Sequence, residues 1–156
     1  MGELIMKNKK VITADEYLNQ LKMMYKSYFD LEENKDIGGR NFALYAFSHV
    51  KNQKYFATKS IKIWEYANYE HCLVSLKNYK EKLIPQKRFL NNIKDEIIEL
   101  HRNHKQSYIS YIQIREDTIE EKEIEKIKNF SYSKSFMLGL RGWCDLRLIC
   151  VDLKNN

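Results

Sequence analysis

Little in this chain would divide it into separate parts. Among its 156 residues there are one proline and five glycines, so few segments have the composition of a flexible linker. No run reaches the roughly 18–20 consecutive apolar residues that a membrane-spanning helix needs. We therefore predict a short arm over residues 1–12, a single domain over residues 13–156, and no membrane partner.

Cysteine is also scarce, and its spacing excludes the common metal motifs. The three cysteines, Cys72, Cys144 and Cys150, form no C-x-x-C pair and have no histidine at ligand spacing. We expect them to be small core residues, with no metal ion and no cofactor bound. The first residues, MGELIMKNKK, lack the apolar stretch of a signal peptide, which favours a cytoplasmic location.

The glycine-rich motifs of familiar enzyme families are missing as well. The chain has no G-x-G-x-x-G, no P-loop and no G-x-S-x-G, so nucleotide chemistry of these kinds is disfavoured. What the chain does have is a composition of 44% hydrophobic and 13% aromatic residues, which is enough to build a folded core.

Basic residues exceed acidic ones, giving a net charge of +6. One interpretation is an anionic partner such as nucleic acid. The other is compositional drift, because lysine greatly outnumbers arginine and arginine is the better phosphate ligand. The charge alone does not separate the two.

The hydrophobic periodicity predicts an α+β fold with elements in the order α-β-β-β-α-β-α-β-β. Thr13 and Glu16 form a capping box at the start of the first helix, which we expect to end near Glu33 and Asn34. Short connections between the strands favour a mostly antiparallel sheet with the helices packed on one face. The predicted strands cover 41–50, 54–66 (one long strand, or two short ones joined by a bend near Lys59-Ser60), 69–76, 107–114 and the two arms of a hairpin turning at Arg141-Gly142. The other two helices are predicted to cover 85–105 and 118–130.

One segment could carry metal-dependent nuclease chemistry. In CDLRLICVDLK, Asp145 and Asp152 flank an apolar strand and Lys154 follows Asp152 by two residues. Restriction-like nucleases hold Mg²⁺ with two such carboxylates and polarise the attacking water with the lysine. Against this, the acid-x-Lys lies outside the expected core, and residues seven apart on a strand point to opposite faces.

Two histidine-containing segments are weaker candidates. Glu70, His71 and Cys72 are adjacent, but neighbouring side chains on a strand point apart, so a Cys-His nucleophile is not formed locally. His101 and His104 have the i, i+3 spacing of helical metal ligands without a third ligand. We therefore assign no catalytic residue and no metal site.

Lysines and aromatic residues are the basis for a nucleic-acid hypothesis. Lys87, Lys94 and Lys105 are predicted to form a basic stripe on the second helix. Many aromatic residues fall on predicted strands, where they could stack with single-stranded bases or simply fill the core. They are Tyr45, Phe47, Tyr55, Trp64, Tyr66, Tyr69, Tyr108, Tyr111, Tyr132 and Trp143.

The C-terminal run K-S-F-x-x-G-x-x-G-W (Lys134–Trp143), with LYAFSHVKNQKYFATKS and YEHCLV upstream, carries a family resemblance. The chain resembles a family of short uncharacterised proteins from low-GC Gram-positive bacteria, a domain of unknown function. That resemblance implies no activity or cofactor. The interpretation we favour is a binding protein without catalytic activity, which uses its sheet or closing hairpin for a protein partner or for self-association. The alternatives are nucleic-acid binding and the divergent nuclease.

Overall fold

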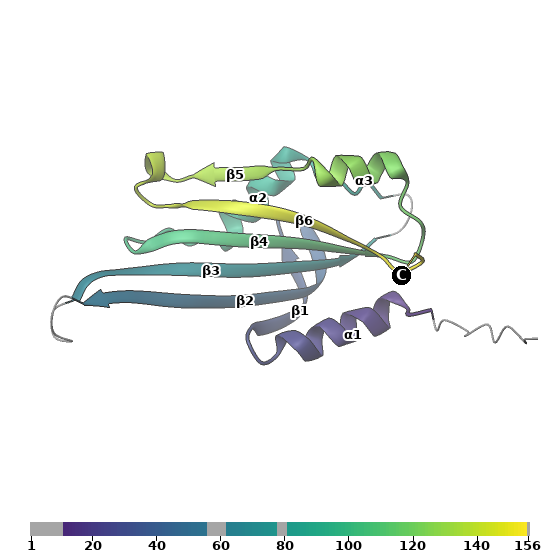
Figure 1. Cartoon of the computed structure of the whole chain (residues 1–156), viewed down its shortest axis with the longest axis horizontal. Helices are drawn as coiled ribbons and strands as arrows, with labels where there is room; N and C mark the ends of the chain where they lie inside the picture. Colours follow the sequence, from purple (N-terminus) through teal and green to yellow (C-terminus); the bar gives the residue numbers. More distant parts are fainter. Residues whose placement is uncertain (1–10, 56–61, 78–80, 156) are drawn as a thin grey trace, which may run out of the picture.

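The structure, a computed structural model, describes residues 11–55, 62–77 and 81–155 (Figure 1). Three α-helices flank one six-stranded sheet, and a 3₁₀ turn, Met137–Gly139, joins the last two strands. The helices are α1 (Ala14–Tyr25), α2 (Lys87–Ile97) and α3 (Glu121–Lys128). The strands are β1 (Asp30–Ile37), β2 (Arg40–Tyr55), β3 (Lys62–Leu76), β4 (His104–Arg115), β5 (Tyr132–Ser135) and β6 (Trp143–Asp152).

The sheet is mixed, so the predicted mostly antiparallel arrangement is wrong. The strand order is β1-β2-β3-β4-β6-β5. The central pairs β3–β4 and β4–β6 are parallel, whereas β1–β2, β2–β3 and β5–β6 are antiparallel. The two parallel pairs are joined by connections that contain α2 and α3, and such long crossovers return the chain in the same direction.

The helices lie on both faces of the sheet, which corrects the prediction that they share one face. Leu18 and Leu21 of α1 pack into one core cluster, and Phe89 and Ile93 of α2 pack into the other. Figure 1 shows α1 in front of the sheet and α2 behind it. We call these the α1 face and the α2 face. No helix among the described residues is long and apolar enough to cross a membrane.

The first helix begins as predicted but ends early. The Thr13 side chain accepts a hydrogen bond from the Glu16 amide, and the Glu16 carboxylate accepts one from the Thr13 amide. The helix then stops at Tyr25, and residues predicted as its tail belong to β1. This strand, DLEENKDI, is mostly exposed and charged, a composition that protects a sheet edge from pairing with other chains.

The number of strands before α2 agrees with the prediction only because two errors cancel. β1 was missed, and the segments predicted as 54–66 and 69–76 include one strand, β3, which continues through the two residues left between them, Ala67 and Asn68. Residues 51–53, which separate the predicted strands 41–50 and 54–66, lie inside β2. The predicted bend near Lys59 and nearly all of the predicted arm lie outside the described residues.

The second helix is shorter than its apolar spacing indicates. It ends at Ile97, and His104 is already the first residue of β4. Leu100, which continued the apolar helical pattern, is 47% exposed. The segment that follows α2 therefore runs across the α2 face as an irregular connection, and it supplies one wall of the site described next.

Candidate functional site

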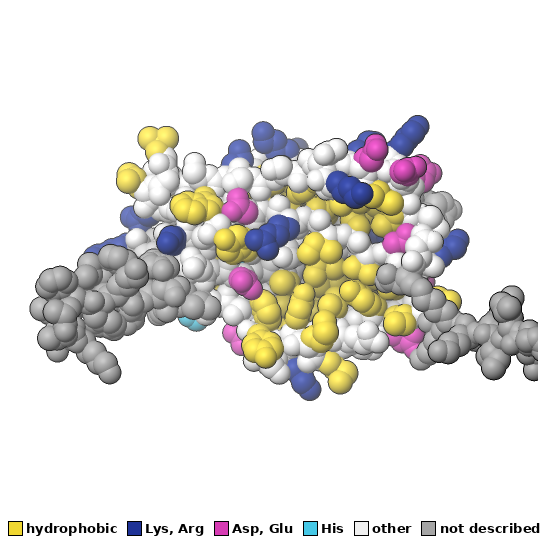
Figure 2. Space-filling model, viewed as in Figure 1, with side chains coloured by type: hydrophobic (Ala, Val, Ile, Leu, Met, Phe, Trp, Pro, Cys, Tyr) yellow, Lys and Arg dark blue, Asp and Glu magenta, His cyan; other side chains and the backbone are white. Residues whose placement is uncertain are grey.

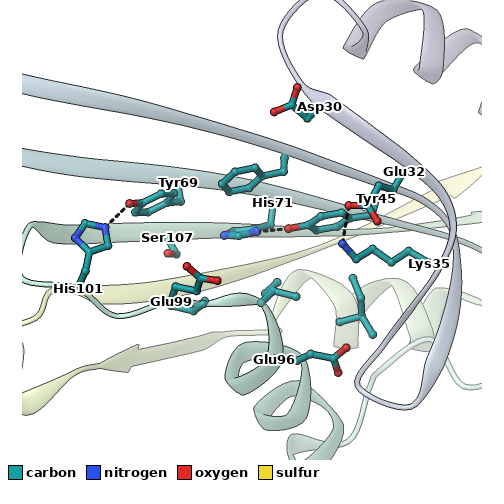
Figure 3. Close-up of a pocket in the computed structure, with 14 residues that line it drawn as sticks. Asp30, Glu32, Lys35, Tyr45, Tyr69, His71, Glu96, Glu99, His101 and Ser107 are labelled. Atoms are coloured by element: carbon teal, nitrogen blue, oxygen red, sulfur yellow. Dashed lines mark hydrogen bonds and ion pairs between the residues drawn. The ribbon is translucent and has the colours of Figure 1, made fainter.

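A row of aromatic and imidazole rings lies on the α2 face of β2 and β3 (Figure 3). Phe47 is near its centre, with its ring centroid 6.1 Å from that of Tyr69 and 5.1 Å from that of His71. His49 stacks on Phe47 and Tyr69, and Tyr45 stacks on His71. We call these five residues the aromatic row. Alternate positions on paired strands put all five side chains on one face.

The remaining histidines of the chain extend this row. His104 stacks on Tyr69 with a centroid separation of 5.7 Å and is hydrogen-bonded through Nε2 to the Ser107 hydroxyl at 2.9 Å. His101 is hydrogen-bonded to the Tyr69 hydroxyl. The four histidines in the sequence therefore gather in one place, although they come from β2, β3, β4 and the connection before β4.

His71 is the most deeply placed of them. It is only 3% exposed, and its Nδ1 is hydrogen-bonded to the Tyr45 hydroxyl at 2.9 Å. Burial, with further contributions from His104 and Lys35, lowers the pKa of His71 to about 4. Burial likewise raises the pKa of Tyr45 to about 12. At neutral pH this buried pair is uncharged.

A pocket of about 490 Å³ opens over the aromatic row. Strands β1 to β3 form its floor and one side, and the C-terminal end of α2 with the following connection forms the other. Tyr45, Phe47, Tyr69 and His71 line the floor, and Ile97 and Ile98 face them. Its size lies within the range of about 300–1,000 Å³ that is usual for small-molecule sites.

A backbone irregularity in β1 gives the pocket its polar rim. In a regular strand Asp30 and Glu32 would share a face with residue 34, and Lys35 and Ile37 would point the other way. Asn34 instead has φ of 53°, a left-handed conformation that asparagine tolerates better than most residues. The alternation is reset there, and all four side chains line the pocket.

The rim is acidic although the chain as a whole is basic. Four carboxylates, those of Asp30, Glu32, Glu96 and Glu99, face one lysine, Lys35.

Two of these carboxylates are already engaged. Glu32 forms an ion pair with Lys35 at 2.8 Å, and Glu96 accepts a hydrogen bond from the Gly38 amide at 2.6 Å. Asp30 and Glu99 have no ion-pair partner within the described part of the chain. Glu99 lies beneath Tyr69 and His71 in Figure 3 and contributes, after burial, to raising the pKa of Tyr69.

The carboxylates of the nuclease hypothesis lie apart. Leu148 packs in the core of the α2 face and Val151 in that of the α1 face. By alternation along β6, Asp145 therefore faces the α1 side and Asp152 the α2 side. Asp145 accepts a hydrogen bond from the Gln106 side chain at 2.9 Å. The structure does not bring these two acids together around one position.

Asp152 organises the C-terminal turn. Its carboxylate accepts hydrogen bonds from the backbone amides of Ile119, Lys154 and Asn155, and from the Asn155 side chain. These donors, acting against burial, lower the pKa of Asp152. The Lys154 side chain is exposed at the end of the described chain.

The lysines of the nucleic-acid hypothesis do not form one helical stripe, because α2 ends at Ile97. Lys87 opens the helix, Lys94 lies in its last turn and pairs with Asp95, and Lys105 belongs to β4. Several of the aromatic residues considered for stacking are core residues: Tyr111, Tyr132 and Tyr45 are 1%, 8% and 7% exposed. The side chains of Tyr55, Trp64 and Tyr66 lie outside the described residues.

The other sequence candidates divide between the two faces. Cys72 is on the α1 face, where burial raises its pKa to about 11 and it interacts with Tyr25, so its side chain points away from that of His71. His101 and His104 are not on a helix, and their rings are nearly perpendicular at 6.3 Å. Among the described residues there is no group of three or more histidine, cysteine and acidic side chains that could hold a metal ion.

These features define an α+β domain with one mixed sheet and a single-sided pocket over a row of aromatic and histidine rings. The chain belongs to the family described as domain of unknown function DUF8052, whose model matches residues 13–156. The predicted membership in a family of unknown function is thereby confirmed, and its bacterial distribution stays a prediction. No curated protein and no solved structure matches the chain.

Proposed function

We propose that the protein binds a small organic cation, an amine with an aromatic or apolar body, in the pocket over the aromatic row. The observation that carries this proposal is the pairing of an aromatic floor with two rim carboxylates, Asp30 and Glu99, that have no ion-pair partner among the described residues. Aromatic faces attract cations, and carboxylates complete the neutralisation.

One cation–π contact of this kind is already present in the pocket, between two of its own residues. The Lys35 ammonium lies 4.3 Å from the centroid of the Tyr45 ring. A ligand ammonium placed toward the other end of the row would meet Tyr69 and Glu99 in the same way. Its apolar part would cover Phe47 and contact Ile97 and Ile98, which line the opposite wall.

Binding is favoured over catalysis because the buried groups are held neutral. His71 has a pKa of about 4 and is hydrogen-bonded to Tyr45, whose own pKa is about 12. A general base works best with a pKa near the operating pH. Neither partner meets that condition, so we assign both to shaping the pocket floor.

A cytoplasmic location is part of the same proposal. Cys72, Cys144 and Cys150 are all free, and cytosolic proteins keep their thiols reduced.

Calorimetric titration with three phenyl compounds of similar size tests the charge preference. We expect 2-phenylethylamine to bind, 2-phenylethanol to bind at least tenfold more weakly, and 3-phenylpropionate not to bind. All three offer the same ring to the aromatic floor, but only the amine matches the acidic rim. Equal affinity for the alcohol and the amine, or preference for the carboxylate, would overturn the proposal.

The Glu99→Gln variant tests the role of the rim. Because the substitution removes one charge without changing the size of the side chain, we expect about tenfold weaker amine binding, equivalent to about 1.4 kcal/mol. Binding of 2-phenylethanol should not change. Glu125→Gln is the matched control, because Glu125 is exposed on α3 outside the pocket. If both variants bound the amine like the wild type, Glu99 would have no part in the site.

A further inference from the structure

The connection between β5 and β6 exposes a group of apolar side chains to solvent. Leu138 is 101% exposed, Leu140 is 81% exposed and Met137 is 63% exposed. Figure 1 shows this connection at one end of the molecule, beyond the end of β5, and Figure 2 shows hydrophobic side chains projecting at the same end. We call residues 137–140 the tip. Folding gains nothing from exposing three such residues side by side.

The backbone of the tip adopts a conformation that is costly for these residues. Met137 and Leu138 have φ of 48° and 55°, in the left-handed region that few non-glycine residues adopt. Backbone hydrogen bonds hold the turn closed, from the Phe136 amide to the Gly142 carbonyl and from the Gly142 amide to the Gly139 carbonyl. Strain of this kind persists where the surrounding structure imposes it, and it is frequent at functional positions.

The chain on both sides of the tip is basic. No acidic residue occurs between Phe130 and Asp145. Lys134 and Arg141 flank the tip on the two sides of the hairpin, and the backbone of Lys105 lies against Gly142. Trp143, which follows, is 38% exposed. Tryptophan is enriched at the boundary between lipid headgroups and acyl chains.

We propose that the tip inserts into the surface of an anionic lipid bilayer. A protruding aliphatic tip flanked by Lys134 and Arg141 matches a planar surface that is negatively charged outside and apolar within. Nucleic acid fits less well, because the three tip side chains offer no ring on which a base could stack. This proposal rests on the tip alone, independent of the pocket, and it replaces our expectation from the sequence that no membrane is involved.

Vesicle co-sedimentation of the full chain tests the proposal. The probes are phosphatidylcholine vesicles and vesicles in which about a quarter of the lipid is phosphatidylglycerol, at about 0.1 M salt, where the Debye length is about 10 Å. We expect the wild type to bind the anionic vesicles and to bind the neutral ones at least fivefold more weakly. The double variant Leu138→Asn, Leu140→Ser should lose at least fivefold of the binding to anionic vesicles.

The variant is chosen to preserve the fold, because asparagine tolerates the left-handed conformation of residue 138 and both side chains lie in solvent. The matched control is Met23→Gln, Met24→Gln, which removes two exposed apolar side chains (66% and 59% exposed) from α1. This control should bind like the wild type. If the wild type did not bind anionic vesicles, or if the tip variant bound them equally well, the tip would not be a membrane contact.

Discussion

The Gly142→Ala variant is expected to lose about 3 kcal/mol or more of its free energy of unfolding. Gly142 has φ of 73°, and a Cβ atom there would overlap the carbonyl group of Lys105 and lie 2.8 Å from its Cα. The obstacle is backbone within β4, which cannot move without breaking the pairing of β4 with β6. Both the conformation and the close approach therefore require glycine at this position.

Gly139→Ala separates these two effects. Gly139 also has a positive φ, 90°, but a Cβ there would meet nothing within 4 Å. We expect it to cost only about 1 kcal/mol, from the backbone conformation alone. Urea unfolding of the two variants measures the difference. Equal free energies of unfolding for the two variants would show that a Cβ atom at residue 142 does not clash with the β4 backbone.

A fall in pH from 7 to 4 is expected to destabilise the protein by about 3 kcal/mol through His71 alone. The ordinary histidine pKa is 6.5, and burial lowers that of His71 to about 4. Between these values the unfolded chain binds a proton that the folded protein does not bind. The contribution of neutral, buried His71 to the free energy of unfolding is therefore fully present above pH 6.5. It is lost as the pH falls toward 4, by about 1.36 kcal/mol for each unit of difference between the two pKa values.

Other groups also contribute to the pH dependence, so the measurement compares variants. The pKa of His104 is lowered too, mainly by burial, and adds to the loss in the same direction. We expect His71→Gln to be less stable than the wild type at pH 7 but to lose about 3 kcal/mol less on going to pH 4. His49→Gln, at an exposed position of the same row, should keep the wild-type pH dependence. If the His71→Gln variant lost as much stability as the wild type between pH 7 and pH 4, His71 would not be buried in its neutral form.

Local signals in the sequence predicted the parts of the fold that local chemistry determines. The capping box at Thr13 and Glu16 starts α1 as expected. The alternation around Tyr45 and Phe47 places them on a strand, and the glycines of K-S-F-x-x-G-x-x-G-W lie in the β5–β6 connection. The structure also shows why residue 142 must be glycine: a Cβ atom there would overlap the backbone of β4. No local sequence pattern contains that information, because β4 is distant in the sequence.

Long-range pairing was the part that sequence did not predict. Alternation shows which side chains share a face but not the direction of the neighbouring strand, so the parallel pairs around β4 were missed. β1 has no apolar alternation and resembled a helix tail, and the apolar spacing of α2 continued to Leu100 after the helix had ended.

The candidate site was missed for the same reason. Its acids come from β1, at Asp30 and Glu32, from the last turn of α2, at Glu96, and from the connection after α2, at Glu99. The change of face at Asn34 depends on a single backbone angle. A sequence signal was present in the aromatic residues at Tyr45, Phe47 and Tyr69, but their interpretation as a stacking surface for bases did not anticipate a pocket with an acidic rim.

A crystal structure of the protein soaked with 2-phenylethylamine tests the central claim most directly. The account predicts that the phenyl ring lies on Phe47 and Tyr69 and that the ammonium lies within hydrogen-bond distance of the Glu99 carboxylate, with Lys35 still over Tyr45. An amine bound elsewhere on the molecule, or bound in the pocket with its ammonium turned away from the acidic rim, would contradict it.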